Sequence, residues 1–233
     1  MSITNTIAEP LAKVTARIQD AARVTGRNPN SVRLIAVSKT QPALAIMQAY
    51  ACGQRDFGEN YVQEALEKQS ELADAPNLVW HFIGPIQSNK TRAIAENFAW
   101  THSIDREKIA QRLNAQRPAD LPPLQVCLQV NIDDETTKAG VSLANLATLA
   151  KAVSQLPRLQ LRGLMAVPAA DNSVEQQHQA FAKLRMALIG LQAQGYQVDT
   201  LSMGMSGDLE AAIAEGATMV RVGTDIFGAR IKT

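Results

Sequence analysis

The feature that most constrains the fold of this chain is a regular alternation of short apolar runs with longer amphipathic stretches. Such a run, closed by Pro or Gly and followed by helix formers, is typical of a buried strand in a parallel sheet. The expected strands lie in Val32–Thr40, Asp56–Glu59, Leu78–Ile83, Ala99–Ile104, Leu124–Val130, Leu159–Val167, Thr200–Met203 and Thr218–Val222. The expected helices are Pro42–Ala51, Tyr61–Leu72, Ser88–Asn97, Asp105–Gln116, Leu143–Leu156, Val174–Gln194 and a short one ending at Glu215.

Eight strand-and-helix units in 233 residues favour a closed barrel of the α/β class, a single (β/α)8 TIM barrel. The structural alternative is a doubly wound open sheet, which usually has fewer strands and needs an edge. Thr4–Thr25 carries apolar residues at helical spacing and ends near Gly26, so we expect an extra N-terminal helix. No linker or charge block divides the chain, which favours one domain, 1–233.

The composition excludes several classes of function. A net charge of +1 and 4% aromatic residues give no electrostatic footprint for nucleic acid or an anionic membrane. Met1–Leu11 contains no signal-peptide core, and no apolar run reaches a spanning length. Cys52 and Cys127 define neither a disulfide framework nor a zinc site. We therefore expect a cytoplasmic monomer without a metal.

Lys39 stands where the first strand stops, at the end of a parallel strand where α/β enzymes place their chemistry. Burial disfavours the charged form of an amine, and an uncharged amine is a nucleophile toward aldehydes. The competing interpretation is a solvated lysine that flanks the strand.

The seventh and eighth strands end in small residues that could surround an anion. Ser202–Gly207 is a serine- and glycine-rich loop that leads into a helix, and Gly223 and Thr224 follow Arg221. Loops after strands seven and eight form the recurring phosphate site of such barrels, and in a closed barrel strand eight lies beside strand one. These loops could equally be simple turns, and Asp208 would repel a phosphate unless it pointed away.

Five segments of the chain together resemble the pyridoxal phosphate homeostasis protein family. They are A-V-S-K-T (36–40), F-G-E-N-Y-V-Q-E (57–64), W-H-F-I-G-P-I-Q-S-N-K (80–90), R-G-L-M-A-V (162–167) and the long stretch from S-M-G-M-S-G-D to D-I-F-G (202–228). The resemblance implies the alanine racemase N-terminal-type barrel, fold type III of pyridoxal-phosphate proteins. It also implies the cofactor pyridoxal 5′-phosphate (PLP), held as an internal aldimine without robust turnover.

By that resemblance Lys39 is the Schiff-base lysine and Arg221 faces the pyridine nitrogen. An arginine stays protonated, so it keeps that nitrogen unprotonated and weakens the ring as an electron sink. The resemblance assigns the phosphate region to Ser202, Met203, Ser206, Gly223 and Thr224.

Racemases of this fold also need a second base, which comes with a separate β-domain. The sequence ends at Thr233, shortly after the eighth unit, so we expect no such domain. None of Tyr50, Tyr61 and Tyr196 lies at a suitable strand end. These features predict no catalytic residue and favour a protein that holds and releases PLP.

Two residues are secondary candidates for cofactor binding. Asn60 follows the second strand and could bond the cofactor ring, although it is equally expected in a turn. Lys138, in the family-like spacing N-x3-E-x2-K-x-G, could be a second amine that receives or hands on PLP, or a solvated loop lysine. For His81, within the third strand, a hydrogen-bonded core histidine is the favoured interpretation.

Three functions remain open at this point. The first is a PLP-binding protein that takes part in intracellular PLP homeostasis and delivery, with apo PLP-dependent enzymes as possible partners. The second is a PLP-dependent amino-acid racemase of low activity. The third is a cofactor-free aldolase in which Lys39 attacks the substrate carbonyl.

Overall fold

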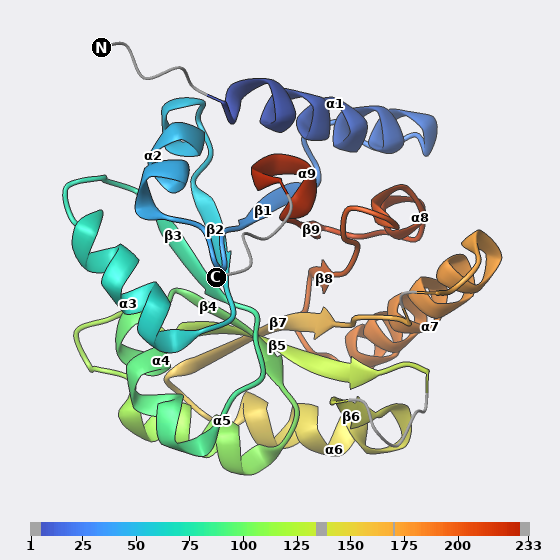
Figure 1. Ribbon diagram of the computed structural model, residues 1–233. Coiled ribbons are helices and arrows are strands. Elements are labelled where there is room, and N and C mark those ends of the chain that lie inside the picture. The colour runs from blue at the N-terminus through green and yellow to red at the C-terminus, as the bar shows by residue number, and fades with distance from the viewer. Residues whose placement is uncertain (1–5, 134–138, 170, 229–233) are drawn as a thin grey trace.

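A closed parallel barrel forms the centre of the molecule, as the computed structural model shows for residues 6–133, 139–169 and 171–228 (Figure 1). The strands follow the order β4-β3-β2-β1-β9-β8-β7-β5, and a β4–β5 pairing closes the ring. The eight-stranded TIM barrel predicted from the sequence is therefore confirmed. Its strands are β1 (Arg33–Val37), β2 (Asp56–Glu59), β3 (Val79–Phe82), β4 (Trp100–Ile104), β5 (Leu124–Asn131), β7 (Leu159–Met165), β8 (Thr200–Ser202) and β9 (Met219–Val222).

A ninth strand, β6 (Val141–Ser142), was not expected from the sequence. It pairs in parallel with the end of β5, beside the barrel. Two residues are too few to show the alternation by which a strand is recognised, so the sequence gives no signal for it.

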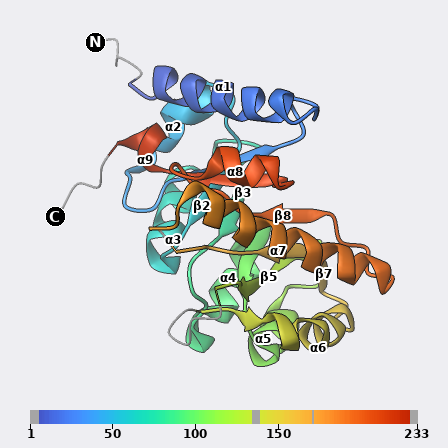
Figure 2. The same cartoon turned by 90° about the vertical axis from the view of Figure 1, so that its right-hand side faces the viewer.

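Helices surround the barrel (Figures 1 and 2). The N-terminal helix α1 is amphipathic, and its buried Leu11, Val14 and Ile18 face α8, α9 and α2. It is the extra helix that precedes the first unit. The helical elements are α1 (Ala8–Val24), α2 (Ala43–Ala51), α3 (Val62–Glu71), the 3-10 turn η1 (Ser88–Lys90), α4 (Thr91–Asn97), α5 (Glu107–Gln116), α6 (Leu143–Ser154), α7 (Val174–Ala193), α8 (Leu209–Ala214) and α9 (Thr224–Phe227).

The strands alternate between two kinds of buried surface. In β9, Val220 and Val222 belong to the main apolar core shared with the helices, whereas Met219 belongs to a second, small apolar cluster. Because side chains alternate along a strand, Arg221 lies on the same face as Met219, toward the barrel interior. The small cluster consists of Ile35, Trp100, Cys127, Met165 and Met219. The interior of the barrel is therefore mixed, with an apolar layer and a buried cation.

The barrel closes tightly between β7 and β8. A Cβ atom added at Gly163 would lie 1.9 Å from the carbonyl oxygen of Thr200, so only glycine allows this approach. Among the described residues, no helix combines the length and apolar character needed to cross a membrane.

Candidate functional site

A cavity of about 370 Å³ opens at the carboxyl ends of the barrel strands. It brings together side chains that are far apart in the sequence but follow neighbouring strands. They are Val37 and Lys39 after β1, Asn60 after β2, Ile83 after β3, Val167 after β7, Met205, Ser206 and Gly207 after β8, and Arg221, Gly223 and Thr224 of β9 and α9. A lysine, an arginine, two hydroxyls and two glycines thus share one cavity, with Val37, Ile83 and Val167 as apolar walls.

The turn that carries Lys39 is fixed by backbone hydrogen bonds. The Ser38 amide donates to the carbonyl of Gly58 (3.0 Å), and Gln41 donates back to the carbonyl of Ser38 (3.0 Å). Thr40 adopts a positive φ of 63°, which is unusual for a residue with a branched side chain. Such a conformation persists where the surroundings determine it, so the position of Lys39 is tightly constrained.

A buried ionic cluster holds this turn from below. The Lys68 ammonium donates to the Ser38 carbonyl (2.7 Å), to Glu59 (2.8 Å) and to Glu64 (2.5 Å). The Ser38 hydroxyl also donates to Glu59 (2.6 Å), and the Thr40 amide donates to Glu64 (2.5 Å). Burial raises the pKa of Glu59, although the neighbouring Lys68 acts against that change. The cluster connects α3 to both sides of Lys39.

The opposite edge of the cavity consists of the loop after β8 and the start of α9. Gly204 has a φ of +95°, and its carbonyl accepts the backbone N–H of Arg221 (2.9 Å). A Cβ atom added at Gly223 would lie 3.1 Å from the Val37 carbonyl oxygen, so this backbone lies close to β1. The two loops and the first strand therefore form one continuous rim.

The acidic residues of this edge are engaged elsewhere. The Asp208 carboxylate accepts the backbone N–H of Met205 (2.5 Å), and burial raises its pKa. Glu210 pairs with Arg17 of α1 (2.9 Å). These partners weaken the repulsion that the two carboxylates would exert on an anion in the cavity.

Arg17 also connects the two parts of this edge of the cavity, the loop after β8 and helix α9. One of its nitrogens donates to the Ser206 carbonyl (3.0 Å) and another pairs with Asp225 in α9 (2.6 Å). No sequence pattern indicates this role, because α1 lies outside the repeating units.

Arg221 is buried, with 5% of its surface exposed. Its guanidinium donates to the Ser202 hydroxyl (2.7 Å) and to the Ala166 carbonyl (2.9 Å). Desolvation lowers the pKa of Arg221 to about 10, against the opposing field of Asp208 and Cys127. The side chain is therefore still a cation at neutral pH.

Six of the nine residues proposed from the sequence line the cavity: Lys39, Asn60, Ser206, Arg221, Gly223 and Thr224. Ser202 and Met203 are fully buried and are not among its lining residues. The Ser202 hydroxyl contacts His102 and Arg221, and the Met203 amide donates to the carbonyl of Met219. Lys138 lies outside the described residues.

Lys68 and His102 are not among the residues predicted from the sequence, yet both leave a signal in it. Lys68 occupies the apolar face of α3, in register with the buried Val62 and Ala65, where a lysine is unusual. His102 lies two positions after Trp100 in a fully buried strand, so both point to the same face. His81 is a hydrogen-bonded core histidine, as predicted.

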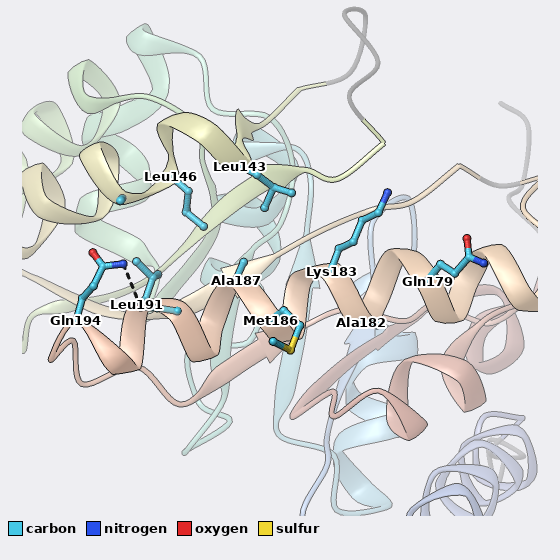
Figure 3. A pocket seen from close by; sticks show the side chains of 11 residues that line it. Leu143, Leu146, Gln179, Ala182, Lys183, Met186, Ala187, Leu191 and Gln194 are labelled. Carbon is cyan, nitrogen blue, oxygen red and sulfur yellow. Dashed lines mark hydrogen bonds between the residues drawn. The ribbon is translucent and has the colours of Figure 1, made fainter.

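A larger cavity, of about 790 Å³, lies between α6 and α7 (Figure 3). Its walls include Leu143, Leu146, Met186 and Leu191, with Lys183 on the helix α7. None of the residues at the strand ends lines it. Its polar lining residues, Gln179, Lys183 and Gln194, are spread along α7 and its end rather than gathered at one point, so the smaller cavity at the barrel mouth is the better candidate site.

Comparison with known proteins agrees with this fold. The family model described as "Alanine racemase, N-terminal domain" matches residues 10–231. The "Pyridoxal phosphate homeostasis protein" of Pseudomonas aeruginosa is 63% identical over 226 residues, covering 97% of this chain and 96% of the relative.

Two solved structures of PipY from Synechococcus elongatus have the same fold. The structure without PLP has a TM-score of 0.87 and 44% identity, and covers 96% of this chain and 100% of PipY. The structure with PLP bound has a TM-score of 0.80 and 43% identity, and covers 91% of this chain and 100% of PipY. The chain belongs to the alanine racemase N-terminal domain family, and within it to the pyridoxal phosphate homeostasis proteins.

Proposed function

We propose that this protein binds PLP in the cavity at the barrel mouth and takes part in PLP homeostasis, without robust catalysis. The observation that carries the proposal is the gathering of Lys39, Arg221, Ser206 and Thr224 around one cavity. The PLP-bound structure of PipY and the name of the Pseudomonas relative support it. When bound, PLP supplies an aldehyde that condenses with an amine, and a pyridine ring that withdraws electrons.

The residues present fit such a cofactor. The cavity volume lies within the range of small-molecule sites, and its polar groups converge from several strand ends. The close approach of Gly223 to Val37 leaves backbone rather than side chain at the rim. The buried Oδ1 atom of Asn60, which also lines the cavity, has no hydrogen-bond partner within the described part of the chain. We therefore propose Asn60 as a contact of the ring or of the groups around it.

Each charged residue has a separate proposed role. Lys39 supplies the amine that anchors the aldehyde, and the Glu59–Lys68–Glu64 cluster holds its turn. Arg221 presents a cation to the pyridine nitrogen, which disfavours a proton there and so disfavours carbanion chemistry. Ser206, Gly223 and Thr224 bind the phosphate. Ser202 and Met203 belong to the layer beneath, because their polar groups are already bonded.

The remaining roles follow from holding a cofactor rather than transforming a substrate. We propose that the protein is a cytoplasmic monomer, that 1–233 is one domain, and that it passes PLP to apo PLP-dependent enzymes. Lys138 stays a candidate for a second amine in that transfer. The names of the relatives support homeostasis as the role.

The proposal is tested by titrating the protein with PLP and recording its absorption spectrum. Wild type should develop the visible band of a lysine-bound cofactor, and Lys39→Ala should lose it. Lys183→Ala removes a lysine from the cavity between α6 and α7 and serves as the matched control. A band that survives in Lys39→Ala would exclude Lys39 as the anchor, and wild type without any band would exclude the function.

A further inference from the structure

We propose that Asp56, His81, His102 and Ser202 form a hydrogen-bond chain through the barrel in which every donor points toward Asp56. This chain holds the Arg221 guanidinium in place at the cofactor cavity. The inference deepens the proposed function, because it rests on Arg221 facing PLP. The five residues come from five strands: β2, β3, β4, β8 and β9. None of the three central side chains, His81, His102 and Ser202, is exposed to solvent.

The contacts form a continuous path. Asp56 lies 2.9 Å from Nε2 of His81, and Nδ1 of His81 lies 3.0 Å from Nε2 of His102. Nδ1 of His102 lies 2.8 Å from the Ser202 hydroxyl, which accepts from Arg221 at 2.7 Å. Asp56 is the first residue of its strand and Ser202 the last of its own, so the path crosses the barrel lengthwise.

The Asp56 end determines the direction of every bond once both histidines are neutral, the state that their burial favours. An ionised carboxylate can only accept hydrogen bonds, so Nε2 of His81 donates to Asp56 and Nδ1 of His81 accepts. His102 then donates from Nε2 to His81 and accepts the Ser202 proton at Nδ1. The Ser202 oxygen also accepts from Arg221, whose guanidinium can only donate. The two neutral histidines therefore share the same tautomer.

An extra proton on Nδ1 of His81 would place two donors face to face, and one on Nδ1 of His102 would reverse its bond to the Ser202 hydroxyl. Burial lowers the pKa of His81, and burial together with His81 and Arg221 lowers the pKa of His102 well below its usual value. The charged and titratable groups around the path are Arg33 and Asp56 at one end, Arg221 and Asp208 at the other, and Cys127 inside the barrel. Burial raises the pKa of Cys127 to about 12, so its thiol is neutral.

The indole of Trp100 keeps the two imidazoles in position. Its ring centroid lies 5.7 Å from that of His81, with the planes 18° apart, and 5.8 Å from that of His102. The hydrogen-bond chain is thus held by packing against Trp100. His81, His102 and Ser202 act as positioning residues for Arg221.

The first test needs no cofactor. Imidazole ¹⁵N chemical shifts of the full-length protein report the tautomer of each of its three histidines, and His178→Gln identifies the one outside the chain. At pH 7.5 we expect both His81 and His102 to be neutral and protonated on Nε2. A proton on Nδ1 of His102, or an imidazolium at either position, would overturn the chain.

The second test asks whether the chain acts on the cofactor. Ser202→Ala disconnects Arg221 from His102. We expect the dissociation constant of PLP to rise about tenfold, the effect of losing one charge-assisted hydrogen bond, and the absorption band of bound PLP to shift. Ser103→Ala, a buried serine of β4 that donates to Gly84, is the control and should stay within about twofold of wild type. Equal spectra and affinities in the two variants would contradict the coupling.

A third variant covers the case in which Ser202→Ala does not fold. Asp56→Asn keeps an acceptor oxygen at the far end, so the histidine tautomers and the PLP spectrum should stay as in wild type. Asp56→Ala removes the acceptor, so both the tautomers and the spectrum should change. Identical behaviour of these two variants would contradict the chain. If wild type binds no PLP, the proposed function fails, while the tautomer measurement still decides whether the chain exists.

Discussion

At the scale of single residues, the site depends on buried charges that are compensated by near neighbours. Lys68 is 5% exposed and contacts Glu59 and Glu64 beneath the Lys39 turn. A buried charge that loses its partner costs several kcal/mol, so each member of this cluster is needed once the others are present.

Lys68→Met should therefore destabilise the protein by about 3–5 kcal/mol and weaken PLP binding, because Glu59 loses its cation and the Ser38 carbonyl its donor. Urea denaturation and PLP titration measure the two effects. Lys13→Met removes an exposed lysine that also pairs four residues away, with Glu9, and should change neither. Equal stability of Lys68→Met and Lys13→Met would refute this role.

The two buried histidines make the stability depend on pH. Burial lowers the pKa of His81 and of His102 in the folded chain. Below the ordinary pKa of 6.5, both histidines are therefore protonated in the unfolded chain but stay neutral in the folded chain until the pH falls further. Their contribution is complete above pH 6.5 and falls as the pH drops, at most by about 1.4 kcal/mol per pH unit for each.

Denaturation midpoints at pH 7.5 and 5.5 check this prediction, and His102→Gln should show the smaller loss. Glu59 acts in the opposite direction, since burial raises its pKa and its contribution decreases as the pH rises above 4.5. The difference between wild type and His102→Gln removes that effect. Parallel pH profiles for the two proteins would be inconsistent with a neutral His102.

The site residues differ in how far the sequence reveals them. Lys39 and Ser206 follow strand ends and Arg221 is the penultimate residue of β9, so strand prediction alone brings the three to one end of the barrel. Ser202 is predicted at the same edge, but it is the last residue of β8 and its side chain points into the barrel. Strand limits expected from sequence are uncertain by at least one residue, and a shift of one residue moves a side chain to the opposite face of the sheet. The partners of His81 come from β2 and β4, and only the folded barrel shows that they meet.

At the scale of elements, α1 is more than a cover for the barrel. Its Arg17 bonds the Ser206 loop, α8 and α9 together, so the helix that precedes the repeating units positions the proposed phosphate edge. The sequence predicts the helix from its apolar spacing, but the tertiary contact of a polar residue has no periodic signature.

Arg17→Ala should weaken PLP binding several-fold and lower stability by about 1 kcal/mol, because three acceptors lose a shared, partly exposed donor. Equilibrium dialysis with PLP measures the affinity. Arg23→Ala on the same helix, where the arginine pairs locally with Asp20, is the control and should retain wild-type affinity. Matching affinities would show that α1 does not act on the edge.

At the scale of the whole molecule, closure of the barrel brings the first and last strands together and creates the site. The alternation of strands and helices predicted that closure, whereas the tight contact between β7 and β8 depends on one glycine that the sequence does not distinguish from others. Gly163 meets the Thr200 carbonyl at a distance that admits no side chain.

Gly163→Ala should therefore destabilise the protein by more than about 3 kcal/mol, since the contact is with backbone and requires the strands to separate. Gly190→Ala, within α7 and with open space around its Cβ position, should instead be neutral or stabilising by about 0.5–1 kcal/mol. Thermal and urea unfolding compare the two. A Gly163→Ala protein as stable as wild type would contradict the described packing of β7 on β8.

We propose above all that one amine, at the end of the first strand, captures PLP beside Arg221. Borohydride reduction of the PLP-loaded protein, followed by proteolysis and mass spectrometry, locates the modified residue directly. We expect a single labelled peptide that carries the cofactor on Lys39. A label on another lysine, or no covalent label on a protein that retains PLP, would contradict it.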